Sequence, residues 1–313
     1  MDVTGIGHAC IDTIGLVPHL PALDEVLVMD ATTRQGGGPV AQALVTLQRL
    51  GKKTAFHARL GDDAIAQEIR TGLEAEGVDC THLLRDPGHV SNTSIILVDR
   101  ATGKRSICAH RGDYHPIAPA DLDLDALCVA PILHLDGHAP EAALHAAREA
   151  RCRGRIVSMD AGHARDDLIP LAAAATLLIA SEKFAMFATG TGDETAWGPT
   201  LRAMGPSTVV VTRGERGSLT WTADDHFATP AVPVDVVDTT GAGDVFHGGY
   251  LYAVLEGRSP RECATIASAV AAMKCRSLGG RAGIPMLPAL SRFLGDHGFT
   301  LERPPCGDFC GDE

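Results

Sequence analysis

The chain has few basic residues for its size. Lysine and arginine number 27 against 39 aspartates and glutamates, so the formal net charge is -12. A chain with this excess of negative charge has no general attraction for nucleic acid or anionic lipid. Any phosphate that it binds must be held by a local cluster of donors. We therefore expect no nucleic-acid partner and no membrane partner.

Long apolar runs and a leader sequence are also missing. No apolar stretch approaches membrane-spanning length, and Met1-Asp2-Val3 lacks the basic and apolar regions of a secretory signal. We expect a cytoplasmic protein. The 9 cysteines are scattered through a chain too large to need staples, which favours reduced thiols over a disulfide framework. Cys306 and Cys310 have no second ligand pair nearby in sequence, so we predict no metal site there.

The remaining composition suits one large α/β core. With 313 residues and 45% hydrophobic content, we expect one domain over 1–313. Strand-like runs alternate with helical patterns, which is typical of a mostly parallel sheet with helices on both faces. The pattern predicts strands at 2–7, 54–60, 132–135, 155–160, 176–180 and 208–212, and helices at 40–50, 64–76, 141–151, 243–256 and 261–274.

Two regions interrupt this alternation. The stretch 12–35 has no clear helical period, and 93–111 contains two short strands joined by the turn 100–104. Extra strands of this kind do not join a doubly wound sheet easily. We therefore expect these two regions to form a small separate β-layer.

The most informative stretch is 238–250, which places glycines where a strand becomes a helix. Residues 234–237 are mostly apolar and partly β-branched, which predicts a strand, and an apolar helical pattern follows the glycines. At such a junction Gly241 and Gly243 let backbone N–H groups approach a ligand, and the helix N-terminus adds partial positive charge. Phosphate oxygens suit that site. A bound anion repels a neighbouring carboxylate, so we expect Asp244 to have a task of its own.

Phosphoryl transfer to an alcohol provides such a task. The hydroxyl must lose a proton as it attacks, and preorganised donors must meet the charge on the transferring oxygens. We therefore assign Asp244 as general base and the N–H groups of Gly241, Ala242 and Gly243 as the anion hole. The plainer alternative is a glycine-rich turn whose aspartate favours the helix dipole.

Two motifs together resemble a known enzyme family. The first, 238–244, reads Asp-Thr-Thr-Gly-Ala-Gly-Asp and is followed by a hydrophobic pair and then Gly248-Gly249; the second, 35–51, begins Gln-Gly-Gly-Gly-Pro and ends Leu-Gly. They are similar to the C-terminal and N-terminal signatures of the PfkB, or ribokinase-like, carbohydrate kinases. The resemblance implies a ribokinase-like α/β fold. It also implies that the β-layer is a lid that closes over the sugar and supports a homodimer.

The resemblance implies residues that hold the acceptor. Asp12 matches the family aspartate that binds substrate hydroxyls, and Gly36 and Gly37 permit close approach of a small polar ligand. The family's sugar-binding asparagine falls at Ala41 here, and Gln42 beside it is the candidate substitute.

A weaker signal near the N-terminus points elsewhere. Gly5-Ile6-Gly7 begins like a dinucleotide fingerprint, but Cys10 stands where its third glycine should be. The residues after Cys10 favour a strand or loop, and we expect a strand that delivers Asp12 to the carboxyl edge of the sheet. A nicotinamide-dependent oxidoreductase stays open as an alternative, as does Asp12 as a loop-capping residue.

On the nucleotide side, the resemblance assigns ATP contacts to the strand and turn 209–217, at Thr212, Gly214 and Gly217. A plain strand and hairpin turn would look similar. It also assigns adenine contacts to Ser268 and Gly280, although tight helix packing explains small residues there equally well.

The metal-ordering motif of the family is altered in this chain. Relatives carry Asn-x-x-Glu, tied to Mg²⁺ and phosphate, where this chain has Ser181 and Phe184. Glu182 is the candidate for part of that role through a water, but a helix N-cap with an acidic first turn explains Ser181 and Glu182 as well. Relatives also bind a monovalent cation, such as K⁺, at the positions of Asp238 and Thr240.

These motifs predict an ATP- and Mg²⁺-dependent kinase that phosphorylates a hydroxyl, expected to be primary, of a sugar or sugar-like molecule. A nucleoside acceptor is an alternative, although only 4% of residues are aromatic and could stack on a second base. A non-catalytic sugar sensor is another. The C-terminal motif looks especially like the sulfofructose kinase branch, but Val26, Ala109 and Gly137 stand where we expect that branch to place sulfonate donors. We therefore expect a different acceptor.

Overall fold

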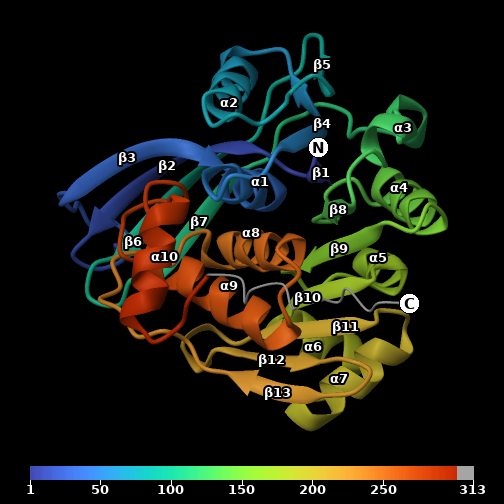
Figure 1. Cartoon of the computed structure of the whole chain (residues 1–313). Helices are drawn as coiled ribbons and strands as arrows, with labels where there is room; N and C mark the ends of the chain where they lie inside the picture. The colour runs from blue at the N-terminus through green and yellow to red at the C-terminus, as the bar shows by residue number, and fades with distance from the viewer. Residues whose placement is uncertain (302–313) are drawn as a thin grey trace, which may run out of the picture.

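The computed structural model describes residues 1–301, which form two β-sheets and the helices around them (Figure 1). The Cys306 and Cys310 tail lies outside the described residues. Within them, no helix is both long and apolar enough to cross a membrane.

The larger sheet has the strand order β13-β12-β11-β10-β9-β8-β1-β4-β5. Strand β12 pairs antiparallel with β11 and β13, and all other pairs are parallel. Its strands are β1 (Val3–Ile6), β4 (Thr54–Gly61), β5 (Leu83–Asp86), β8 (Ile132–Leu135), β9 (Ile156–Ala161), β10 (Leu177–Ser181), β11 (Thr208–Thr212), β12 (Ser218–Trp221) and β13 (His226–Thr229).

Helices cover both faces of this sheet, as the sequence predicts. They are α1 (Pro39–Arg49), α2 (Ala64–Glu74), α3 (Leu124–Leu127), α4 (Pro140–Cys152), α5 (Ile169–Ala174), α6 (Glu182–Thr189), α7 (Glu194–Ala203), α8 (Ala242–Leu255), α9 (Pro260–Cys275) and α10 (Leu287–Asp296). Local signals set several of their starts. Pro39 occupies the first turn of α1, and Ser259 and Glu262 form a reciprocal capping box at α9.

Two hydrophobic cores result, one on each face of the sheet. Buried residues of α1, α8, α9 and α10 form one, and those of α4, α5, α6 and α7 form the other. Side chains along β10 alternate between them, because Ile179 joins the first core whereas Leu178 and Ala180 join the second. The buried apolar run in this strand therefore reflects a sheet covered on both sides.

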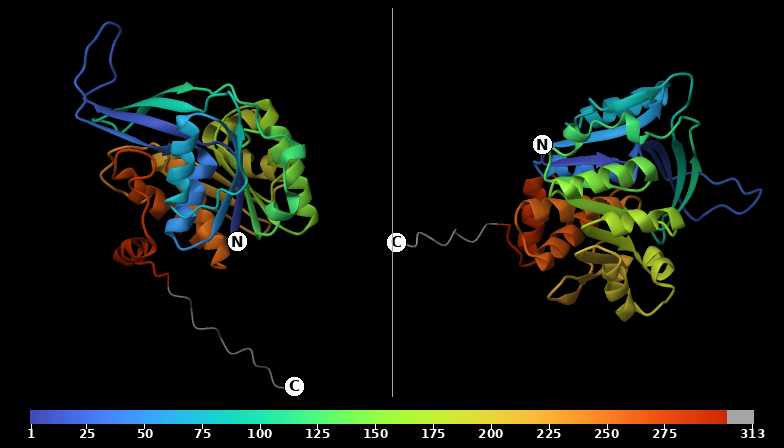
Figure 2. Two further views of the ribbon diagram at one scale, coloured as in Figure 1. Left: turned by 90° about the horizontal axis from the view of Figure 1, so that it is seen from above. Right: turned by 90° about the vertical axis from the view of Figure 1, so that its right-hand side faces the viewer.

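A separate four-stranded sheet, the lid sheet, has the order β3-β2-β6-β7. It contains β2 (Cys10–Val17), β3 (Ala31–Gly37), β6 (Thr93–Asp99) and β7 (Arg105–His110). The prediction of a small separate β-sheet is thus confirmed, and its strands run over 10–17, 31–37, 93–99 and 105–110. Ile14, Ile96 and Val98 form its small core. The connection 18–30 between β2 and β3 projects from the body of the molecule (Figure 2).

Three local predictions need correction. The predicted strand 234–237 is irregular, because Pro233 has no N–H and the N–H groups of Val237 and Asp238 donate to the Cys275 carbonyl at the end of α9. The hairpin of β12 and β13 was not predicted. Strand β1 is followed directly by β2, so the dinucleotide fingerprint at 5–10 lacks the helix that it requires.

Candidate active site

The anion hole predicted from the sequence lies at the N-terminus of α8. Gly241 caps the helix with a φ of 73°, in the left-handed region that favours glycine, and its carbonyl accepts the N–H of Val245 at 3.0 Å. The N–H of Ala242 donates to the Thr239 carbonyl at 3.2 Å. Within residues 1–301, the N–H groups of Gly241 and Gly243 have no such partner, so these two are the available donors.

Asp238 fastens this loop to its neighbours. One oxygen of its carboxylate accepts the N–H of Thr240 at 2.7 Å and the Thr240 hydroxyl at 2.6 Å, and the other accepts the N–H of Gly279 at 2.7 Å. Lys274, which is completely buried, donates from Nζ to the Asp238 carbonyl at 2.8 Å. The segment at which a monovalent cation is predicted therefore already has a lysine ammonium bound to its Asp238 carbonyl.

Asp244 occupies the first turn of α8 and is partly exposed. Desolvation and the Asp160 carboxylate raise its pKa to about 7, while His247 and Arg105 act in the opposite direction. A carboxylate with a pKa near neutrality is suited to accept a proton during catalysis. The base predicted from the motif therefore has electrostatic surroundings that suit the role.

A buried histidine follows Asp244 by one helical turn on α8. His247 follows it by three residues on α8, and its Nε2 is 3.4 Å from Asp160 at the carboxyl end of β9. The ring of His134, from β8, lies 5.3 Å from that of His247. Burial, with His247 nearby, lowers the pKa of His134 to about 4.

The predicted acceptor residues lie on β2 and β3, in the lid sheet. Asp12 is buried, and the Cys10 thiol donates to it at 3.2 Å. Burial raises the pKa of Asp12. Asp12 is therefore positioned by a lid strand and not by the carboxyl edge of the large sheet. A Cβ at Gly37 would stand 2.1 Å from its carboxylate, so glycine is required there.

Gly36 and Gln42 lie next to Arg281, which packs against the predicted acceptor residues on β3. A Cβ at Gly36 would lie 2.3 Å from the guanidinium carbon of Arg281. The Gln42 side chain is buried and accepts the Arg281 Nε–H at 3.0 Å, and a Cβ at Gly280 or Gly241 would lie 2.0 or 3.6 Å from its Nε2. Gln42 thus lies between the predicted acceptor residues on β3 and the loop that carries the anion hole.

A lid arginine reaches the same loop. Arg105, the first residue of β7, donates to the Thr239 hydroxyl at 3.1 Å. Thr239 also donates from its backbone N–H and its hydroxyl to the Gly103 carbonyl, in the turn between β6 and β7. The lid hairpin is therefore docked on the segment that precedes the anion hole.

The predicted nucleotide residues lie at neighbouring strand ends. Ser181 and Thr212 are register partners at the carboxyl ends of β10 and β11. The turn after β11 places Gly214 and Gly217 at φ of 59° and 77°. Both glycines therefore meet a backbone requirement of this turn, whatever their role toward ATP.

Two other nucleotide-side residues have structural partners. Ser181 caps α6 by accepting the Phe184 N–H at 3.1 Å, and Glu182 pairs with Arg216 at 2.7 Å. Ser268 is buried in α9. Ser181 therefore caps a helix and Glu182 forms an ion pair, in addition to the nucleotide and metal roles that the motif predicts for them.

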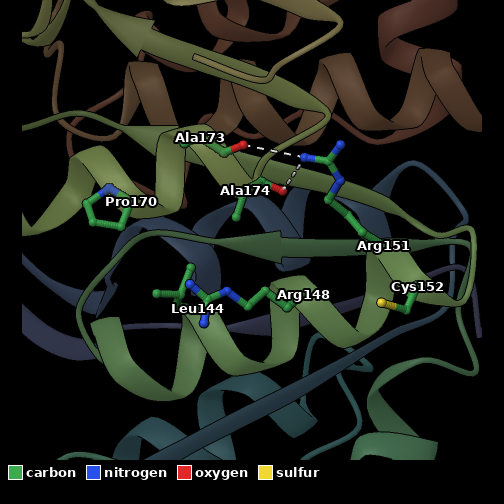
Figure 3. Close-up of a pocket in the computed structure, with 7 residues that line it drawn as sticks. All are labelled: Leu144, Arg148, Arg151, Cys152, Pro170, Ala173 and Ala174. Carbon is green, nitrogen blue, oxygen red and sulfur yellow. Dashed lines mark hydrogen bonds between the residues drawn. The ribbon is translucent and has the colours of Figure 1, made fainter.

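The cavity drawn in Figure 3 belongs to a different part of the molecule. It has a volume of about 360 Å³ and lies between α4 and α5, where Arg151 donates to the carbonyls of Ala173 and Ala174. These residues lie at the C-terminal ends of their helices, and therefore at the amino edge of the sheet. Asp244, Asp160, Ser181 and Thr212 gather at the opposite edge, where open α/β sheets bind their ligands.

Sequence reasoning gave no role to His247, His134, Lys274 or Arg105. The spacing of His247 from Asp244 was a usable signal, because residues three apart share a helix face. The others reach the site from distant elements, and nothing in their local sequence marks them.

The two sheets, with an acidic residue and free N–H groups at one helix N-terminus, define a ribokinase-like α/β kinase. A putative ribokinase from Agrobacterium tumefaciens has the same fold, with a TM-score of 0.88 and 28% identity over 97% of this chain and 99% of that one. Residues 2–287 match the PfkB family of carbohydrate kinases. The chain belongs to this family of phosphotransferases, whose acceptor is an alcohol.

Two of the curated relatives are named for a riboside and a nucleoside. The chain is 31% identical to aminoimidazole riboside kinase from Salmonella typhimurium, over 83% of this chain and 88% of that protein. It is 27% identical to a nucleoside kinase from Methanothermobacter thermautotrophicus, over 97% of this chain and 98% of that protein. These names describe the relatives, and they leave the acceptor of this chain to be determined.

Proposed function

We propose that this kinase transfers the terminal phosphoryl group of ATP to a primary hydroxyl of a sugar or sugar-like molecule. The observation that carries the proposal is the position of Asp244. It shares the first turn of α8 with the free N–H groups of the anion hole. A base and an anion site therefore lie side by side, and we place the acceptor between them and Asp12.

In this mechanism Asp244 accepts the proton of the acceptor hydroxyl as its oxygen bonds to phosphorus. The bond between that phosphorus and the bridging oxygen breaks, and ADP leaves. The N–H groups of Gly241 and Gly243 meet the charge on the transferring oxygens. Asp12 binds acceptor hydroxyls, with the backbone of Gly36 and Gly37 beside it.

ATP would lie along the carboxyl ends of β10 and β11, near Thr212, Gly214 and Gly217. Mg²⁺ bound with ATP supplies positive charge to the phosphates. Glu182 is the proposed water-mediated contact to the ion, and for this it must share its carboxylate with Arg216.

A monovalent cation at Asp238 and Thr240 is not required by the contacts found there. Because Lys274 donates to the Asp238 carbonyl, we propose that its ammonium supplies the positive charge expected from K⁺. Burial lowers the pKa of Lys274, and the nearby Asp238 acts against that shift. Such a group keeps the loop in place without a dissociable ion.

The acceptor is proposed to be a sugar, with a nucleoside or riboside as the second candidate because two of the curated relatives carry such names. The C-terminal motif resembles the sulfofructose kinase branch. Val26, Ala109 and Gly137 stand where that branch is expected to place sulfonate donors, and none of them has a polar side chain. We therefore propose an acceptor other than a sulfosugar. Asp244 and its glycines argue against a sugar sensor that has lost catalysis.

The proposed partner is a second copy of this chain, bound through the lid. Large apolar side chains are exposed on the lid sheet and its projecting connection, including Val26 at 94%, Ile95 at 60% and Ile107 at 51%. Exposed apolar area of this kind is typical of an interaction surface.

A coupled assay of ATP consumption tests the function. We would screen hexoses, pentoses, ketoses, sugar phosphates, sulfosugars and nucleosides, with the Asp244→Asn variant as blank. Acceptor-dependent ADP release that is lost in the variant is the expected result. NAD binding without ATP binding would contradict the proposal and support an oxidoreductase.

A further inference from the structure

Three potential metal ligands gather at the base of the lid. Asp86 ends β5, His89 lies in the connection to β6, and His115 lies in the connection that follows β7. Each residue can offer one ligand atom, and the three atoms lie within 4.8 Å of one another. The rings of His89 and His115 meet edge to face, with their centroids 5.0 Å apart.

Existing contacts hold the carboxylates of this cluster in place. Asp86 accepts the backbone N–H of His115 at 2.7 Å, and the same oxygen lies 2.8 Å from the Nδ1 atom of that residue. Asp113 accepts the N–H of Val90 at 2.7 Å and lies 3.4 Å from Nδ1 of His89. Both carboxylates are therefore fixed by backbone donors on the segments that flank the β6–β7 hairpin.

One imidazole nitrogen in the cluster, on a side chain that is 31% exposed, has no hydrogen bond within the described part of the chain and only a long contact to Asp113. Nδ1 of His89 is buried, and it makes no hydrogen bond to any of residues 1–301. A metal ion that accepts the lone pair of this nitrogen would give it a shorter and stronger contact. The position of this nitrogen beside Asp113 and near His115 therefore suits a metal ligand.

We propose that Asp86, His89 and His115 bind a divalent transition-metal ion, with Zn²⁺ as the preferred ion and Asp113 as fourth ligand. Imidazole nitrogen favours Zn²⁺, Co²⁺ or Ni²⁺ over Mg²⁺ and Ca²⁺, which prefer all-oxygen sites. Tetrahedral ligands about 2.1 Å from zinc lie about 3.4 Å apart, so the widest pair must close by on the order of 1 Å and the Asp86–His115 pair, now 2.8 Å apart, must open slightly. The connections that carry the two histidines permit a movement of this size, since Gly88 adjoins His89.

Binding would cross-link the segments that enter and leave the β6–β7 hairpin. The ion would stabilise the base of the lid, because it binds the folded arrangement and not the separated loops. This site uses none of the residues proposed for phosphoryl transfer. Its test is therefore independent of the kinase activity.

Metal binding can be measured on the full chain after removal of metals with a chelator. We would titrate Zn²⁺ calorimetrically in buffer without Mg²⁺ or ATP, and record the visible spectrum with Co²⁺. The variants are His89→Asn and His115→Asn, and the control is His145→Asn, an exposed histidine on α4 outside the cluster. Circular dichroism would check that each variant is folded.

We expect one Zn²⁺ per chain, a tetrahedral Co²⁺ spectrum and a Zn²⁺-dependent rise in Tm. Each cluster variant should weaken binding by at least about tenfold, and the control should bind like the wild type. Absence of stoichiometric Zn²⁺ binding in the wild type would overturn the proposal. Equal affinity in the wild type and in both folded cluster variants would also overturn it.

Discussion

Nε2 of His247 lies 3.4 Å from the Asp160 carboxylate, directly beneath the turn that carries the proposed base. This contact places a titratable ring and a second acid within the electrostatic range of Asp244. The two act in opposite directions, because Asp160 raises the pKa of Asp244 and His247 lowers it. Desolvation is the largest cause of the raised pKa, and this pair adjusts the pH range in which Asp244 can accept a proton.

Substitutions in this pair should move the pH profile in opposite directions. Wild-type kcat/KM should fall as the pH drops below about 7, because Asp244 becomes protonated. In His247→Gln the acidic limb should move to higher pH, and in Asp160→Asn it should move to lower pH. The measurement is kcat/KM from pH 5 to 9 with a responsive acceptor. Shifts in the same direction for both variants would contradict this assignment.

Replacing Lys274 should make the anion-hole loop dependent on added salt. Lys274→Met leaves the Asp238 carbonyl without its buried donor, which should cost about 1–3 kcal/mol of stability. We expect wild-type kcat to be equal in potassium and choline chloride, and the variant to be slower and partly rescued by K⁺. Lys183→Met, at an exposed position on α6, is the control. A wild-type enzyme that requires K⁺ would show that Lys274 does not replace the ion.

Two glycine substitutions separate folding from phosphate binding. A Cβ at Gly243 or at Gly295 would meet no heavy atom within 4 Å, so both alanine variants should fold with nearly unchanged Tm. Only Gly243→Ala should impair transfer, by about tenfold or more, because its methyl group would occupy space beside the anion hole. Steady-state kinetics and thermal melts on both variants test this. Normal kinetics in Gly243→Ala would show that no ligand occupies the space beside this Cβ.

The proposed dimer can be tested by charging the exposed lid face. Ile107→Asp should convert a dimer to a monomer, because a carboxylate would be desolvated in the apolar interface. Val129→Asp is the matched control, since Val129 is 60% exposed but lies outside the lid. Light scattering after size exclusion gives the mass of each variant. A monomeric wild type would contradict the dimer.

Sequence periodicity identified the elements whose burial is regular. The strands at 132–135 and 208–212 were predicted with their observed bounds, since apolar runs of that length suit a sheet covered on both faces. The lid hairpin was predicted because its two strands flank a recognisable turn. The segment 234–237 was wrongly predicted as a strand, since the N–H groups of Val237 and Asp238 donate to the Cys275 carbonyl at the end of α9 and not to a neighbouring strand. The periodicity of apolar residues indicates which segments are buried, but it does not indicate which element each segment pairs with.

The residues of the candidate site also fall into two groups, those that local sequence predicts and those that it does not. Asp244 and the anion-hole glycines follow from local spacing, because a helix N-terminus and its first turn are contiguous in sequence. The surroundings of Asp244 do not, since Asp160, Arg105 and Lys274 come from β9, the lid and α9. Their effect on pKa values and loop position arises only when those elements are assembled.

The most direct test is single-turnover phosphoryl transfer by Asp244→Asn compared with wild type, with ATP affinity measured on the same preparations. The account predicts a loss of transfer of at least about a thousandfold with ATP affinity within a few-fold of wild type. Transfer at a near wild-type rate in a folded Asp244→Asn protein would contradict the assignment of Asp244 as the base.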